Sequence, residues 1–130
     1  MRLRKDQMGH RLATLREGGR VPRVALYART VNGQIPVRSL TAARDFAERM
    51  AWQAGLDQEF TDCLSLTAAE DRLGWLRMKQ RIGSGFIDGI VAITRSDVSP
   101  HLSVYERELG WLALHGGFLA LVHAENVVPQ

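Results

Sequence analysis

The sequence predicts an α/β fold, a three-layer sandwich in which helices cover both faces of a four-stranded parallel sheet. Three observations carry this prediction. Short apolar runs alternate with helical apolar patterns, the connections between them are short, and the 130 residues, 45% hydrophobic and 24% charged, suffice for one domain with a core. Strands that strictly alternate with helices call for parallel pairing and right-handed crossovers.

Four apolar segments predict the strands. The first, residues 24–28, is apolar on both faces, follows Pro22 and ends before Asn32-Gly33. The other three cover residues 59–63, 87–94 and 118–123. Runs of this length, bounded by turn residues, are typical of buried strands.

Three helices are expected between these strands. Ser39 is a suitable N-cap for a helix over residues 39–54, and Thr67 for one over residues 67–82. Ser99-Pro100 predicts a third helix that reaches residue 115, because proline is favoured at the first helical position. Gly55, residues 83–85 and residues 116–117 then stop the three helices.

The N-terminal segment, residues 1–22, is expected to form a basic arm or a short amphipathic helix before the domain at residues 23–130. Residues 1–23 carry seven basic groups against Asp6 and Glu17, a charge of +5, so the remainder of the +3 chain sums to −2. Met8, Leu12 and Leu15 stand at helical spacing. The segment is a candidate contact for nucleic-acid phosphates or a solvated terminus. The candidate DNA-contacting residues are Arg2, Arg4, Lys5, Arg11 and Arg16.

Several classes of protein are not expected from this sequence. It holds no apolar run near 18 residues and no signal-peptide pattern, which predicts a soluble, cytoplasmic protein without a membrane partner. The lone Cys63 excludes an internal disulfide and is expected as a small hydrophobe in or near the core. The four histidines lack ligand spacing, so we expect no metal and no cofactor.

Polar residues follow the first strand, where ligands collect in parallel α/β folds. Arg29 is the candidate for holding a phosphate by paired hydrogen bonds. A surface ion pair is the alternative role for a single loop arginine. Further motifs accompany Arg29 along most of the chain.

Several short motifs follow one another along the chain in a definite order. They are Tyr27-x-Arg29, Ser39-Leu40-x-x-x-Arg44, Phe60-Thr61-Asp62, residues 73–79 and residues 88–93. In this order and spacing, residues 23–122 resemble the catalytic domain of the serine recombinases, the resolvases and invertases. The resemblance implies a resolvase-like, flavodoxin-like sheet and a bacterial or phage setting.

The resemblance also implies a chemistry, which this sequence departs from. In the family a serine hydroxyl attacks a DNA phosphodiester while arginines stabilise the phosphate charge. Here Val31 occupies the serine position, and Asp97 and Pro100 replace two arginines in the segment that aligns with the family's Leu-Asp-Arg-Leu-x-Arg. The matched remnants, expected to bind an anion, are Tyr27, Arg29 and Arg44. The family's long dimerisation helix and separate DNA-binding domain have no counterpart before Gln130.

These departures favour a catalytically inactive serine-recombinase-like domain that works as a regulatory or scaffolding module. Its expected partner is itself or another protein, such as an active recombinase, with a DNA association as an added option. Two alternatives remain open. One is a small DNA-binding protein that uses the basic N-terminal arm, and the other is an enzyme that reuses the pocket for a phosphorylated ligand held by Arg29 and Arg44.

Overall fold

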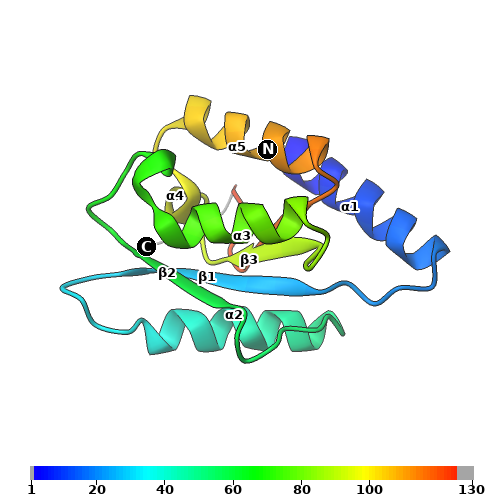
Figure 1. Cartoon of the computed structure of the whole chain (residues 1–130), viewed down its shortest axis with the longest axis horizontal. Coiled ribbons are helices and arrows are strands. Elements are labelled where there is room, and N and C mark those ends of the chain that lie inside the picture. Colours follow the sequence, from blue (N-terminus) through cyan, green and yellow to red (C-terminus); the bar gives the residue numbers. More distant parts are fainter. Residues whose placement is uncertain (1, 126–130) are drawn as a thin grey trace.

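The computed structural model describes residues 2–125 and confirms the predicted α/β sandwich (Figure 1). Its sheet has the strand order β2-β1-β3-β4, and every neighbouring pair is parallel. The strands are β1 (Val24–Thr30), β2 (Glu59–Cys63), β3 (Gly89–Ala92) and β4 (Phe118–Leu121). Strand β2 is added on one side of β1, and β3 and β4 on the other. The topological switch point, where open α/β folds bind ligands, therefore lies between β1 and β3.

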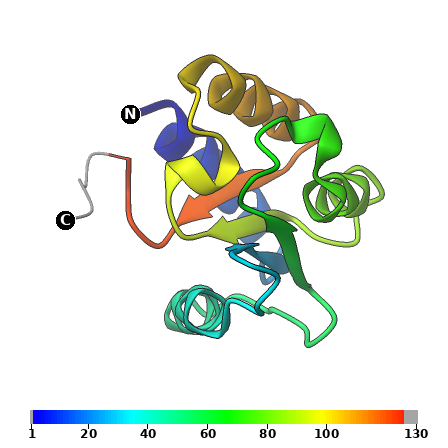
Figure 2. The ribbon, with the colours of Figure 1, turned by 90° about the vertical axis from the view of Figure 1, so that its left-hand side faces the viewer.

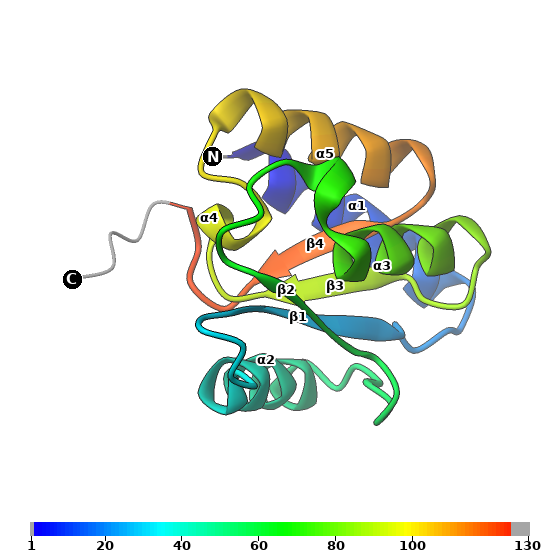
Figure 3. The same ribbon diagram turned by 60° about the vertical axis from the view of Figure 1, so that its left-hand side comes forward.

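Helices cover both faces of this sheet (Figure 3). On one face α3 (Leu73–Gly83) and α5 (Leu102–Leu114) bury an apolar cluster centred on Trp75, Met78 and Leu109. The other face carries α1 (Arg2–Glu17) and α2 (Val37–Arg49), which enclose Leu26 and Phe118 among others. The central strands β1 and β3 are buried on both faces, so Val24–Ala28 of β1 and all of β3 form continuous buried runs without the alternation of a half-exposed strand.

The N-terminal segment is a 16-residue helix packed on β4 rather than an arm in solvent. Leu15, 3% exposed, joins the core cluster that also contains Phe118. Arg4 near the start of α1 is buried to the same degree, 3%, because its guanidinium reaches back over the edge of the sheet to Glu125. The helix therefore shares the core of the domain that sequence analysis begins at residue 23.

The helix boundaries differ from the expected ones for local reasons. Helix α2 ends at Arg49 instead of residue 54, because the chain turns so that Gln53 N donates to Pro22 O at 2.9 Å and Gln53 O accepts from Val24 N at 2.8 Å. Helix α5 begins at Leu102 instead of residue 99, after a separate short helix α4 (Arg95–Val98). Ser39 and Thr67 do not act as N-caps, since α2 and α3 begin after Pro36 and Arg72.

Two groups of loops lie at opposite ends of the strands. We call the loops that come after β1, β2 and β3 the carboxyl pole; they are residues 30–36, 63–68 and 93–101. In Figure 2 this pole faces the viewer. The amino pole comprises residues 18–23, 50–58, 84–88 and 115–117, which precede the strands. Among residues 2–125 no helix has the length and apolar character to cross a membrane.

Candidate functional site at the carboxyl pole

Asp62, near the end of β2, organises the carboxyl pole. Its carboxylate accepts hydrogen bonds from the backbone N–H groups of Gly74 and Trp75, both at 2.9 Å, and from the Tyr27 hydroxyl at 2.8 Å. The first two donors are unpaired amides at the start of α3, so Asp62 caps this helix from a neighbouring strand. Only glycine fits at residue 74, because a Cβ there would lie 2.6 Å from the Thr61 carbonyl oxygen.

The Tyr27 hydroxyl joins this carboxylate to a buried arginine. Tyr27 is fully buried, and Arg72 Nη1 donates to its hydroxyl oxygen at 3.3 Å. Burial raises the pKa of the Tyr27 phenol well above its ordinary value, with the Arg72 charge acting in the opposite direction. The phenol is therefore protonated at neutral pH and donates its proton to Asp62.

Arg72 is the residue of this site that sequence analysis misses. Its side chain is fully buried, and within residues 2–125 no carboxylate lies within 4.0 Å of its guanidinium. Its donors go to the carbonyl oxygens of Asp97 at 3.1 Å and Val98 at 2.5 Å, and its Cζ lies 5.5 Å from the Trp75 ring centroid. The available signal is periodicity, because residue 72 is three positions before the buried Trp75.

Arg29 is likewise used by the chain's own backbone. The side chain is 8% exposed, and Nη2 donates to the carbonyl oxygens of Cys63 at 2.8 Å, Leu64 at 3.2 Å and Leu66 at 2.5 Å. Its Nη1 donates to Asp97 O at 3.0 Å, the oxygen that Arg72 also reaches. The two guanidinium groups thus tie the loops after β2 and β3 together across the topological switch point.

Val31 lies at the surface directly after β1. It is 55% exposed and forms a tight turn with Gln34, whose N–H donates to Val31 O at 3.2 Å. Asn32 and Gly33 at the centre of this turn both have positive φ, 55° and 72°, which is the Asn-Gly signature of a two-residue hairpin turn. The turn therefore presents the alkyl side chain of Val31 to solvent.

Arg44 does not join Arg29, so the two side chains do not form the shared phosphate pocket that the enzyme alternative requires. Arg44 lies on α2 and donates to Ala54 O at 2.7 Å and to Glu59 Oε2 at 3.1 Å, at the amino end of β2. Arg29 contacts Cys63 at the other end of that strand. Because a strand rises about 3.3 Å per residue, the two ends of β2 are about 13 Å apart.

The basic N-terminal residues are divided among different roles. Arg4 is not available to DNA phosphates in this fold, because Nε donates to Glu125 at 2.7 Å and Nη1 to Leu119 O at 3.3 Å. Arg11 lies 3.9 Å from Asp88 at the amino pole, whereas Lys5 and Arg16 are exposed. The backbone of Arg2 begins α1.

Cys63 is exposed, which contradicts its expected place in or near the core. Strand β2 is an edge strand whose residues alternate between solvent and core, and residue 63 falls on the solvent side. A 3.1 Å contact with the Ser65 hydroxyl is the main cause that lowers the pKa of the Cys63 thiol. A pocket of about 410 Å³ beside it is lined by Thr30, Leu73, Gly74 and Arg77, among others. Residues 2–125 bring no group of three or more metal-ligating His, Cys, Asp or Glu side chains together.

Several solved structures have a fold similar to that of this chain. The C-terminal catalytic domain of ISC1926 TnpA, an IS607-like serine recombinase, superposes with a TM-score of 0.68 and 14% identity over 80% of this chain and 72% of that chain. The fold is that of a serine recombinase catalytic domain. The N-terminal catalytic domain of TP901-1 integrase matches with a TM-score of 0.66 and 18% identity, over 77% of this chain and 76% of that one.

A third solved structure has a similar fold. The first open reading frame of transposon ISC1904 from Sulfolobus solfataricus P2 covers 85% of this chain and 73% of its own, at 16% identity and a TM-score of 0.56. No family model and no curated protein matches the sequence. At these identities the likeness establishes the serine-recombinase fold, while the chemistry depends on the residues of this chain.

Proposed function

We propose that this chain is a catalytically inactive serine-recombinase-like domain that acts as a regulatory or scaffolding module through contact with a protein partner. The observation that carries the proposal is the state of the carboxyl pole. Val31 presents an exposed alkyl group at this pole. The guanidinium groups of Arg29 and Arg72 are buried there and already donate to carbonyl oxygens of the chain.

The arginine geometry supports the loss of chemistry. Stabilising a phosphate in transfer requires preorganised cationic donors that face the reacting group. Arg72 is fully buried and Arg29 is 8% exposed, so neither presents its donors to solvent. The Asp97 carboxylate, at a position where the family resemblance places an arginine, accepts a hydrogen bond from Thr94 N at 3.1 Å and caps α4.

An apolar surface at the same pole supports a protein partner. Leu64 N donates to Thr30 O at 2.9 Å, which sets the loop after β2 against the end of β1. Large apolar side chains from these loops and the adjoining helix starts are between 38% and 74% exposed. They are Val31, Ile35, Val37, Leu64, Leu66 and Leu73. Gathered exposed apolar side chains are a mark of protein contact surfaces.

The two alternative functions receive less support from this geometry. A basic arm that binds DNA would lose Arg4 to the interior. An enzyme that holds a phosphorylated ligand between Arg29 and Arg44 would need the two side chains to meet, and they lie at opposite ends of β2. A recombinase-like partner, including a second copy of this chain, fits the exposed apolar surface better.

The test of inactivity is a search for a covalent protein–DNA adduct. Wild-type protein is incubated with supercoiled and linear duplex DNA, and the products are separated on a denaturing gel. We expect no adduct, and none from Val31→Ser either, because restoring one hydroxyl does not free Arg29 and Arg72 from their carbonyl partners. An adduct formed by the wild-type chain would overturn the proposal.

The test of association is sedimentation velocity over a range of protein concentrations, with a second copy as the first partner examined. Ile35→Asp places a charge on the apolar surface at a side chain that is 74% exposed. Leu114→Asp, at an 81% exposed leucine on α5, is the matched control. We expect a concentration-dependent dimer that Ile35→Asp abolishes and Leu114→Asp retains. Equal behaviour of both variants would contradict a role for this surface.

A further inference from the structure

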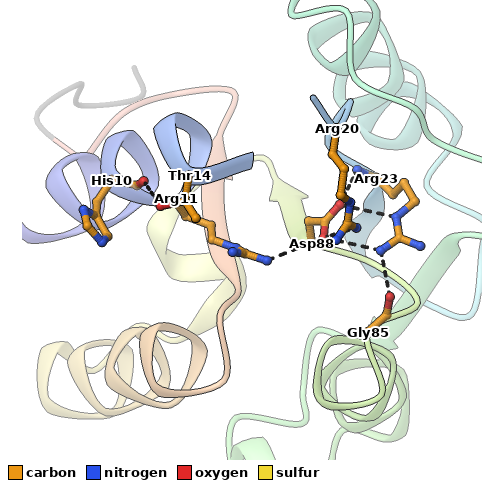
Figure 4. A network of polar contacts seen from close by, with 7 residues as sticks. All are labelled: His10, Arg11, Thr14, Arg20, Arg23, Gly85 and Asp88. Atoms are coloured by element: carbon orange, nitrogen blue, oxygen red, sulfur yellow. Dashed lines mark hydrogen bonds and ion pairs between the residues drawn. The ribbon is translucent and has the colours of Figure 1, made fainter. Parts of the chain in front are cut away.

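The amino pole carries a cluster of arginines that the proposed function does not use. Asp88, which precedes β3, is 3% exposed and is approached by three guanidinium groups (Figure 4). Arg20 Nη2 lies 2.9 Å from its carboxylate, Arg23 Nε lies 3.3 Å away, and Arg11 Nη2 lies 3.9 Å away. Arg11 comes from α1, while the other two come from the segment between α1 and β1.

The charge of this cluster is not balanced. Three guanidinium groups face one carboxylate, which leaves a local charge of +2 at neutral pH. One carboxylate needs one cation for neutrality, so the further two add mutual repulsion that a second anion would relieve. In residues 2–125, Asp88 is the one carboxylate within 4.0 Å of these three groups.

The carboxylate is saturated, whereas the arginines keep donors to spare. Asp88 accepts hydrogen bonds from the backbone N–H of Arg23 at 2.9 Å and from the Arg20 and Arg23 side chains. A guanidinium has five N–H donors. The Arg11 side chain makes no hydrogen bond within the described residues, and its Nε is buried without a partner. The side chains of Arg11, Arg20 and Arg23 are 27%, 47% and 36% exposed, so part of each of these side chains reaches solvent.

A pocket adjoins the cluster and shares Arg20 with it. The pocket has a volume of about 360 Å³ and lies between the end of α1, the 18–22 segment and the turn after α2. That volume is at the small end of the usual range for ligand sites. Leu12, Met50 and Trp52 give it an apolar wall, and Arg16 and Arg20 give it a cationic rim.

From this arrangement we propose that the amino pole binds a nucleotide phosphate. The phosphate oxygens accept hydrogen bonds from Arg11, Arg20 and Arg23, whose planar donors suit bidentate contacts to such oxygens. The flat apolar part of the nucleotide enters the pocket against Leu12 and Trp52. The site is independent of the carboxyl pole. Its ligand is either a free nucleotide or the phosphorylated end of a nucleic-acid strand, which present the same chemistry.

Binding is measured by fluorescence anisotropy of a 5′-phosphorylated, labelled oligonucleotide with the full chain, in a series of salt concentrations. A nucleoside monophosphate and inorganic phosphate serve as competitors. We expect Arg11→Gln and Arg20→Gln each to weaken binding about tenfold at low salt and to lower the salt slope by about one, since each removes one phosphate contact. Arg11→Gln leaves every hydrogen bond to Asp88 in place, so it separates binding from folding.

Arg38→Gln is the matched control, because it removes the same charge from an exposed position on α2 away from the amino pole. We expect it to change affinity less than twofold. Competition by the monophosphate supports a free nucleotide as ligand, and binding of the oligonucleotide alone supports a strand end. Equal losses in Arg38→Gln and Arg11→Gln, inorganic phosphate competing as well as the nucleotide, or no binding of any probe at 1 mM would each overturn the proposal.

Discussion

The two ends of the sheet use arginine in opposite ways. At the carboxyl pole Arg29 and Arg72 are buried and donate to backbone carbonyl oxygens, so that they hold loops in place. At the amino pole Arg11, Arg20 and Arg23 surround one buried carboxylate and keep part of their guanidinium surface in solvent. At the pole where open α/β folds bind their ligands, the Nη donors of both arginines thus go to the chain itself, although each buried Nε lacks a partner among the described residues, and the opposite pole holds the surplus charge.

This contrast shows that the presence of an arginine says little about binding until its partners are known. A guanidinium whose donors are bonded inside the protein contributes to stability, and its removal leaves carbonyl oxygens unpaired. A guanidinium that shares one carboxylate with two others contributes little to stability and attracts anions. The stability of single-residue variants at each pole therefore distinguishes the two uses.

Arg72→Ala should give the largest loss, about 3 to 5 kcal/mol of unfolding free energy, because it leaves the Val98 carbonyl oxygen unpaired, leaves Asp97 O with Arg29 as its one side-chain donor, and opens a cavity beside Trp75. Urea unfolding followed by tryptophan fluorescence measures it. Arg77→Ala, on the better solvated side of the same helix, is the control and should cost less than about 0.5 kcal/mol. Similar midpoints for the two variants would remove the structural role of Arg72.

Arg4→Ala should cost about 3 kcal/mol at pH 7, because the side chains of Arg4 and Glu125 are only 4% and 5% exposed and the change leaves a buried carboxylate without its cation, with the Tyr105 hydroxyl as its remaining side-chain donor. The loss should depend on pH. Burial works to raise the pKa of Glu125, but hydrogen bonds from Arg4 and Tyr105 outweigh it and lower the pKa. A lowered folded-state pKa means that the pair stabilises the fold above the ordinary value of 4.5 and loses this effect as the pH falls through the folded-state pKa.

Urea midpoints of wild type and Arg4→Ala at intervals between pH 7 and pH 2.5 measure this dependence. The two curves should converge in acid. Lys5→Ala, one position along α1 at an exposed side chain, is the control and should follow the wild type throughout. A gap between wild type and Arg4→Ala that stays constant down to pH 2.5 would show that lost packing rather than the ion pair carries the effect.

The architecture was predictable from the sequence because it depends on apolar periodicity. The order of strands and helices follows from that pattern, and the limits of β2 are those expected, residues 59–63. Helix starts were less predictable, since the cap of α3 is Asp62, a residue on another strand that no local signature reveals. Arg4 was misplaced for a related reason, because its partner Glu125 is 121 positions away in the sequence.

The carboxyl-pole site was predictable only in part. Tyr27 and Arg29 do lie at the end of β1 as the motif suggests, but their partners come from loops whose conformation the sequence does not fix. Arg44 fits the family motif by position, while its contacts to Ala54 O and Glu59 depend on the turn that comes after α2. Motif spacing therefore located the residues along the chain and could not say which carbonyl oxygens their donors would meet.

Tyr27→Phe should cost about 1 kcal/mol at pH 7, since Asp62 keeps its two backbone donors and loses one hydroxyl. Alkali should reveal more. The raised pKa of Tyr27 means that its contribution is complete below the ordinary value of 10.0 and declines above it, by about 1.4 kcal/mol per pH unit, as the unfolded phenol ionises first. Urea midpoints between pH 9 and pH 11 should therefore differ in slope between Tyr27→Phe and wild type. Parallel curves would mean that the Tyr27 hydroxyl ionises freely in the folded protein.

Arg20→Gln should have the smallest effect, about 0.5 kcal/mol or less in low salt and nothing measurable in 0.5 M NaCl, because the Arg20 side chain is 47% exposed and Asp88 keeps the backbone and side-chain donors of Arg23. Urea unfolding at the two salt concentrations measures it, with Arg38→Gln as the charge-matched control. This result is the sharpest test of the contrast between the poles. A loss that approached the Arg72→Ala value would make Arg20 a structural clamp like its counterparts at the carboxyl pole, and the surplus charge would then no longer be free to attract an anion.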